Sequence, residues 1–236
     1  MKRKNIVPNN SNNNNSFEIK PQKFELTDKQ KQIINTGLDS KNVRCLIING
    51  RAGTSKSYLS VLIALRLLSL GKIPCINYIR SLIQAKDGET GFLTGNLEEK
   101  TFYYNIPLYD KLSEFLIKPQ IEKLFKEEKI KTYPTSMLRG NQLSGVTIMD
   151  ESQNMRLESL YTVMTRMAEH SLLIILGDTT SQNDLGSQTG FKRVCEMFND
   201  ENSRNNGIFY YELDSSHIVR SKFVKFIVEK FEKLTK

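Results

Sequence analysis

Residues Gly50 to Ser57 read G-R-A-G-T-S-K-S, between the apolar run V-R-C-L-I-I-N and a long apolar stretch with helical spacing. This order of strand, glycine-containing turn, Lys-Ser and helix is the layout of a loop that binds phosphate groups. A tight turn aims backbone N–H groups at phosphate oxygens, and the positive end of the following helix adds to the attraction. We therefore expect this loop to bind a nucleotide through Gly50, Arg51, Ala52, Gly53, Thr54, Ser55, Lys56 and Ser57.

Three side chains of the loop bear on its chemistry. Lys56 can reach the outer phosphates as a point charge, and the Ser57 hydroxyl can coordinate Mg²⁺. Ser55 departs from the usual pattern G-x-x-x-x-G-K-[ST], because it stands where the second glycine belongs. If that backbone requires a positive φ, a residue other than glycine costs roughly 1 kcal/mol. We expect this to weaken nucleotide binding rather than to abolish it.

The stretch from Gly145 to Asn154, G-V-T-I-M-D-E-S-Q-N, supplies the second half of a nucleotide site. A buried parallel strand would deliver Asp150 at its carboxyl end, where open α/β sheets bind ligands. We expect Asp150 to hold the magnesium opposite Ser57, directly or through water. Glu151, one residue further on, would polarise the attacking water as general base.

A third apolar run, Leu172 to Leu176, is followed by G-D-T-T-S-Q, and Gln182 could there sense the γ-phosphate or position the water. Each motif alone has a plainer explanation. A glycine turn before Lys-Ser occurs by chance, paired carboxylates often end a solvated strand, and Gly-Asp after a strand is usually a turn. Three such motifs in this order, each after a strand, favour nucleotide binding.

Composition limits the class of protein. The net charge of +8 over 236 residues favours a polyanionic partner such as nucleic acid without requiring one. Three cysteines without C-x-x-C spacing and two histidines without metal spacing indicate reduced thiols in a cytoplasmic protein, with no zinc site. The start of the chain is basic but has no apolar segment, so we expect no signal peptide. The Asn-rich tail, residues 1–24, should be disordered ahead of a single domain over residues 25–236.

The rest of the chain alternates strands with helices, which predicts a parallel sheet covered on both faces. The predicted strands are Val43–Asn49, Ile73–Ile79, the run that ends at Asp150, Leu172–Leu176 and Gly207–Leu213. Helices are expected after Thr27 or Asp28 and over residues 58–70, 108–116, 119–130, 156–170, 190–198 and 220–234. In the last of these helices the apolar residues Phe223, Ile227, Phe231 and Leu234 should face the core. The long segment from Arg80 to Pro107 reads as a functional loop, and the longest apolar stretch is too short to cross a bilayer.

Several longer motifs resemble the PhoH family of ATPases, from about Gln30 to the last helix. The phosphate loop is similar to that family's G-P-A-G-T-G-K-T, and the family resemblance extends to G-E-T-G-F-L-T-G-N-L-E-E-K, I-P-L-Y-D, M-L-R-G, I-M-D-E-S-Q-N, T-R-M, L-G-D-T-T-S-Q and H-I-V-R-S. The resemblance implies an α/β, RecA-like phosphate-loop NTPase fold related to the motor domains of superfamily-one helicases. It also implies ATP as the nucleotide, beside the Mg²⁺ expected from Ser57 and Asp150, and no guanine-reading N-K-x-D motif is present.

The resemblance also assigns residues outside the phosphate loop. Gln30 resembles the glutamine that such helicases place against adenine, although Gln32 competes with it and an exposed helix position is an equal explanation. Arg166 and Arg220 lie in motifs where the family places arginines, so either could stabilise the γ-phosphate in its own subunit or in a neighbour's site. Arg80 sits where related helicases begin contacts with nucleic acid. His217 replaces the family's usual acidic residue three positions before Arg220.

These observations together predict a Mg²⁺-dependent ATPase, coupled to RNA or single-stranded DNA in the manner of a helicase. Helicases of this kind need a second motor domain, so we expect a homo-oligomer, such as a hexameric ring, to supply the missing wall. An alternative is an ATP-gated module that binds nucleic acid with negligible turnover. A small-molecule kinase fits the size but is disfavoured, because Glu151 beside Asp150 is suited to activating water.

Overall fold

The computed structural model describes residues 17–20, 24–39, 41–80, 106–134, 142–180 and 189–219, together with Phe223, Phe226, Ile227 and Lys230. Five of the described residues, 17–20 and Phe24, belong to the tail that was expected to be disordered up to residue 24. Phe17, Ile19 and Phe24 pack against the core, and the backbone N–H of Lys20 donates to the Phe115 carbonyl at 2.8 Å. The expectation of disorder is therefore wrong for residues 17–20, because alternate apolar side chains there find a buried surface.

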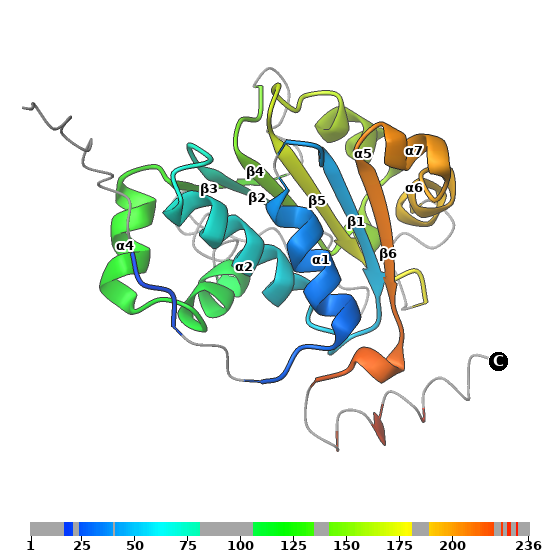
Figure 1. Ribbon diagram of the computed structural model, residues 1–236, viewed down its shortest axis with the longest axis horizontal. Helices are drawn as coiled ribbons and strands as arrows, with labels where there is room; N and C mark the ends of the chain where they lie inside the picture. Colours follow the sequence, from blue (N-terminus) through cyan, green and yellow to red (C-terminus); the bar gives the residue numbers. More distant parts are fainter. Residues whose placement is uncertain are drawn as a thin grey trace, which may run out of the picture.

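A parallel sheet forms the centre of the fold (Figure 1). The described residues contribute six strands in the order β3-β2-β4-β5-β1-β6. Their bounds are β1 Cys45–Gly50, β2 Ile76–Arg80, β3 Ile130–Pro134, β4 Val146–Asp150, β5 Leu172–Gly177 and β6 Ile208–Leu213. β1, β4 and β5 are buried along their whole length, as expected for strands covered on both faces. The predicted parallel sheet is confirmed.

β3 was not predicted. The helix predicted over residues 119–130 included the first residue of β3, Ile130, and no strand was predicted over the rest of I-K-T-Y-P. β3 lies at the edge of the sheet, pairs only with β2 among the described strands, and is half-buried after Ile130. An edge strand with polar residues lacks the continuous apolar run that identified the central strands.

Helices cover both faces of the sheet. α1 (Asp28–Leu38), α2 (Lys56–Ser69), a helix over residues 106–113 and α4 (Lys118–Lys126) pack on one face, where α1 and α2 lie side by side (Figure 1). α5 (Leu157–Met164) and α6 (Phe191–Met197) pack on the other, and α7 (Glu201–Asn205) adjoins β6. The short 3-10 helices η2 (Ser152–Asn154) and η4 (Ser215–His217) follow β4 and β6. None of the helices described here is long and apolar enough to cross a membrane.

The apolar side chains of β1 alternate between the two faces. Leu46 and Ile48 join the cluster under α2, whereas Cys45 and Ile47 join the cluster under α5 and α6. This period of two follows from the pleat of a strand. β5 lies between β1 and β4, so the strand of the phosphate loop and the strand of Asp150 are not neighbours. This order is that of the RecA-like phosphate-loop NTPase fold, which the sequence predicted.

Two predictions about the helices are wrong, one about a face and one about where a helix ends. Phe223 and Ile227 do not face the core, since they are 71% and 38% exposed; Phe231 and Leu234 lie outside the described residues. The helix expected over residues 156–170 ends as α5 at Met164, and Tyr161 on it is 67% exposed. After α5 the chain instead pairs Met167 with Leu143 in an isolated parallel bridge, so tertiary pairing ends the helix early.

Candidate nucleotide-binding site

The phosphate loop joins β1 to α2 and is already curled. Thr54 is fully buried, and its hydroxyl donates to the Arg51 carbonyl at 2.8 Å. Gly53 has a φ of 87°, which glycine adopts without steric cost. Ser55, at the N-cap position of α2, has a φ of 67° and a ψ of 23°, in the left-handed region. The backbone at this position has a positive φ, so a residue other than glycine is strained there.

Lys56 is held by its own loop. Its Nζ atom donates to the carbonyl of Gly50, and to that of Arg51 at 3.1 Å. Burial lowers the pKa of Lys56, and the charges of Asp178, Asp150 and Glu151 act in the opposite direction. The ammonium group therefore lies among carboxylates at the base of the loop, where a phosphate would replace the carbonyls as its partner.

Asp150 receives three hydrogen-bond donors at the end of β4. The Ser57 hydroxyl donates to Asp150 Oδ2 at 3.2 Å, and the Tyr78 hydroxyl donates to the same oxygen at 2.9 Å. The backbone N–H of Glu151 donates to Oδ1 at 3.0 Å. Burial and the nearby charge of Asp150 hold the pKa of Tyr78 well above its ordinary value, so the phenol remains a donor.

Ser57 and Asp150 fit the magnesium that the sequence predicts. Both offer oxygen atoms, which Mg²⁺ prefers, and the two side chains are already in contact. No group of three His, Cys, Asp or Glu side chains able to hold a metal occurs in the part of the chain that is described. Mg²⁺ commonly binds through one or two protein oxygens together with substrate phosphates. The pair is therefore suited to a metal that arrives with a nucleotide.

Glu151 also occupies a left-handed conformation, with a φ of 53°. Its Oε2 accepts a hydrogen bond from Gln153 Nε2 at 2.6 Å, and Gln153 Oε1 accepts one from the backbone N–H of Asp178 at 3.3 Å. Gln153 thus ties the carboxylate after β4 to the first residue after β5. Strained non-glycine residues cluster at functional sites, and Ser55 and Glu151 both line the same cavity.

A cavity of about 580 Å³ lies at the carboxyl ends of β4 and β5 and in front of the phosphate loop. Lys111 and Glu114, joined by an ion pair of 2.7 Å, form part of its wall. The described residues that line the cavity are Phe24, Ala52, Gly53, Ser55, Lys56, Ser57, Tyr58, Lys111, Glu114, Asp150, Glu151, Gln153, Asn154, Gly177, Asp178 and Val219.

The structure thus brings together the predicted residues Gly53, Ser55, Lys56, Ser57, Asp150 and Glu151 with three that the sequence reasoning did not select. These are Tyr78, Gln153 and Asp178. Gln153 lies in the motif I-M-D-E-S-Q-N and Asp178 in L-G-D-T-T-S-Q, and their polar side chains in these motifs were the available signal. Tyr78 stands inside an apolar strand and gave no such signal.

Gln30 is fully buried, so the explanation that it is an exposed helix residue is wrong. Its Nε2 donates to the carbonyls of Thr54 and His217, each at 3.1 Å, while its Oε1 accepts from the Thr27 backbone N–H at 2.9 Å. Gln30 therefore joins α1 to both the phosphate loop and η4. Its predicted contact with adenine stays a prediction.

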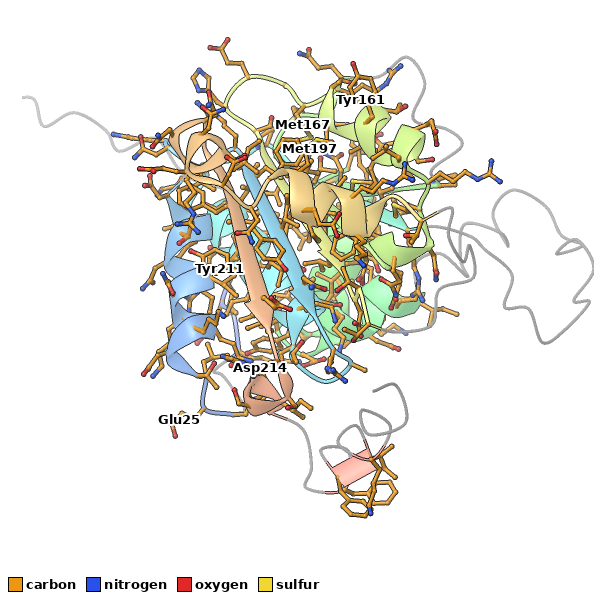
Figure 2. The ribbon with its side chains drawn as sticks, turned by 90° about the vertical axis from the view of Figure 1, so that its right-hand side faces the viewer. Glu25, Tyr161, Met167, Met197, Tyr211 and Asp214 are labelled. Carbon is orange, nitrogen blue, oxygen red and sulfur yellow. The ribbon has the colours of Figure 1, made fainter. Side chains whose placement is uncertain are left out.

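The predicted arginines lie in different places. The Arg166 carbonyl accepts from the Leu143 backbone N–H at 2.9 Å, ahead of β4, and Figure 2 shows the adjacent Met167 at the opposite end of the molecule from Asp214, which follows β6. Because the cavity is at the carboxyl ends of the strands, Arg166 lies at the opposite, amino-terminal end of the sheet. Arg80 ends β2 and pairs with Asp150 in the register of the sheet. Arg220 and Gln182 lie outside the described residues.

His217, at the position where an acidic residue was expected, contacts an acidic residue instead. Its Nδ1 lies 2.8 Å from Asp214 Oδ1. Hydrogen bonds from Ser216, followed by the contact with His217, lower the pKa of Asp214 to about 2. Asp214, the N-cap residue of η4, thus places a carboxylate beside His217.

Comparisons with known proteins agree with these motifs. The family model for PhoH-like proteins matches residues 22–232. A PhoH-like protein of Bacillus subtilis (strain 168) is 37% identical over 188 residues, which cover 78% of this chain and 57% of that protein. Protein PhoH of Escherichia coli (strain K12) is 30% identical over 169 residues, covering 70% of this chain and 47% of that protein.

The chain spans about half the length of the curated relatives it matches. A solved structure of Pif1 helicases at forked double-stranded DNA covers 80% of this chain and 44% of that chain, with 12% identity and a TM-score of 0.34. The family match covers nearly all of the described residues, including the phosphate loop, the Asp150 strand and the C-terminal motif, and the chain therefore belongs to the family of PhoH-like proteins.

Proposed function

We propose that this protein binds Mg-ATP at the phosphate loop and hydrolyses it. One observation carries the proposal: Ser57 from the loop and Asp150 from a non-adjacent strand are in hydrogen-bond contact beside a cavity that Glu151 also lines. Chance motifs would not be expected to converge in this way. The fold supports the placement, because ligands of open α/β sheets bind at the carboxyl ends of the strands.

In this proposal the loop residues Gly50–Ser57 bind the phosphates through their N–H groups and through Lys56, which leaves the loop carbonyls for a phosphate oxygen. Ser57 and Asp150 would hold the magnesium, which neutralises charge on the phosphates when bound. Glu151 would accept the proton of the attacking water, and its hydrogen bond from Gln153 fixes the direction of its carboxylate.

Coupling to RNA or single-stranded DNA is a further part of the proposal. The net charge of +8 supports it, since neutralising backbone phosphates releases counterions and favours binding. Arg80 at the end of β2, next to Asp150 in the register, supports it as well, because nucleic acid bound there would lie close to the metal site. Binding of this kind should weaken steeply with added salt.

A homo-oligomer, such as a ring, completes the proposed site. None of the described residues that line the cavity is an arginine, whereas phosphoryl transfer uses a positive charge at the γ-phosphate. β4 alone, at about 3.3 Å per residue, places roughly 13 Å between the two ends of the sheet near Arg166 and Asp150. This separation disfavours Arg166 in its own site, so the proposal assigns it to a neighbour's site.

The first test is steady-state hydrolysis of Mg-ATP, with and without single-stranded RNA, for the unaltered protein and for Glu151→Gln. We expect turnover that falls by at least about 100-fold in Glu151→Gln, because the amide cannot accept the proton. Stimulation by RNA would support a motor. Nucleotide binding without turnover in the unaltered protein would contradict hydrolysis and favour the ATP-gated binding module.

A further inference from the structure

Tyr78 lies beside the proposed metal site without lining the cavity. It is the third residue of β2 and is 3% exposed. In the sheet Tyr78 pairs with Ile148 of β4, so Asp150, two residues further along β4, is its diagonal neighbour on the same face. A tyrosine ring is long enough to span a diagonal of about 7–8 Å, and its hydroxyl donates to Asp150 Oδ2 at 2.9 Å.

Two side chains hydrogen bond to Asp150 in the described part of the chain, and they differ in kind. Ser57 donates to both carboxylate oxygens, at 3.2 and 3.4 Å, and its oxygen is also the proposed metal ligand. Tyr78 donates to one oxygen only and comes from a neighbouring strand of the sheet. Tyr78 is thus the partner that can keep its contact unchanged when a metal engages Ser57.

We propose that Tyr78 is a positioning residue for magnesium. Its hydroxyl fixes the Asp150 carboxylate in the orientation that binds Mg²⁺ together with Ser57. The inference rests on the proposed function, because the metal is taken to arrive with the nucleotide. Tyr78 acts through Asp150 and touches neither the phosphates nor the base. The side chain is anchored by strand pairing, so it holds the carboxylate before a ligand arrives.

Tyr78→Phe should weaken Mg²⁺ binding, because it removes a hydrogen bond to the carboxylate that is proposed to bind the metal. Phenylalanine at this position keeps the ring and removes the donor, so Asp150 Oδ2 would be held by Ser57 alone among the described side chains. Loss of a hydrogen bond to a metal-binding carboxylate typically lowers metal affinity by about 10- to 100-fold. Nucleotide binding without metal should be unaffected.

The experiment measures binding of a fluorescent ATP analogue to the full chain while Mg²⁺ is titrated, and again in EDTA. In Tyr78→Phe we expect the Mg²⁺ concentration for half-maximal binding to rise by about tenfold or more, with unchanged affinity in EDTA. Tyr211→Phe is the matched control. It removes a phenol of the edge strand β6 that contacts the Thr36 hydroxyl at 2.7 Å and is not among the residues that line the cavity. Its Mg²⁺ titration should match that of the unaltered protein.

A double substitution tests whether Tyr78 acts through Asp150. Asp150→Asn should itself raise the Mg²⁺ requirement, and Tyr78→Phe added to it should raise that requirement no further. Additive effects of the two substitutions would overturn the inference. So would an unchanged Mg²⁺ titration in Tyr78→Phe, or an equal loss of affinity in EDTA, which would mean that the tyrosine supports the pocket as a whole.

Failure of the proposed function would look different. If the unaltered protein bound the analogue neither with Mg²⁺ nor in EDTA, the nucleotide site itself would be refuted, and the positioning role with it. If the unaltered protein bound the analogue with Mg²⁺ and Tyr78→Phe behaved identically, only the role of Tyr78 would be refuted.

Discussion

Among single residues, Ser55 shows where the departure from the family's phosphate loop takes effect. Ser55 adopts a left-handed conformation, with a φ of 67° and a ψ of 23°, at the start of α2. We expect the cost of this conformation to fall on folding, because the folded chain adopts it at the N-cap of α2. We predict that Ser55→Gly changes nucleotide affinity less than about threefold and raises the free energy of unfolding by at most about 1 kcal/mol, since glycine relieves strain but loses more chain entropy.

Ser55→Ala is the control for this prediction, because alanine removes the hydroxyl and keeps the strain. Denaturant unfolding and titration with an ATP analogue measure the two quantities for each variant. A large gain in affinity for Ser55→Gly, without a gain in stability, would show instead that the serine opposes the ligand directly.

At the scale of secondary-structure elements, Gln30 connects α1 with the phosphate loop and with η4. It belongs to the capping box of α1 and donates to the carbonyls of Thr54 in the phosphate loop and His217 in η4. We predict that Gln30→Ala lowers the free energy of unfolding by about 2–3 kcal/mol, because a buried glutamine loses its hydrogen bonds. We also predict that the affinities for ATP and GTP fall by the same factor, because both carbonyls belong to the framework and not to the base.

Thr27→Ala is the matched variant for α1. It removes the capping side chain, which costs about 1 kcal/mol, and leaves the contacts to Thr54 and His217 in place. Its nucleotide affinities should stay unchanged. A loss of ATP affinity in Gln30→Ala that GTP does not share would contradict the framework role and support the adenine contact predicted from the sequence.

For the whole molecule, the position of Arg166 makes a prediction about assembly. An arginine that completes a neighbour's site should be separable from the catalytic carboxylate by mixing two inactive variants. We predict that Arg166→Ala lowers turnover by at least about 100-fold, as arginine fingers do. Mixing Arg166→Ala with Glu151→Gln should restore part of the hydrolysis, because mixed assemblies contain sites with both intact groups.

Asp150→Asn mixed with Glu151→Gln is the control, since both substitutions damage the same copy's site and should not complement. A protein that light scattering shows to be monomeric in ATP, with no restoration in any mixture, would exclude the shared site. Arg220→Ala, mixed in the same way, distinguishes the two arginines that the family motifs offer.

Much of the fold and part of the site could be predicted from the sequence. β1, β4 and β5 were recognised because strands buried on both faces are continuous apolar runs. The edge strand β3 was missed because its residues are only partly buried and carry no such run. The exposure of Phe223 was also missed, because an apolar stripe on a helix indicates that a face needs a partner without saying which partner it has.

By itself, the sequence determined the chemistry that is local along the chain. Short motifs contain the glycines of the phosphate loop and the pairs Lys56-Ser57 and Asp150-Glu151. Their geometry depends on a few neighbouring residues. Only the tertiary structure decided how distant segments are arranged. It places β5 between β1 and β4, brings Tyr78 to Asp150, and sets Arg166 at the end of the strands opposite the cavity. The physical reason is that strand order and register arise from pairing and packing between segments far apart in the chain, and a shift of one residue would turn Tyr78 to the other face.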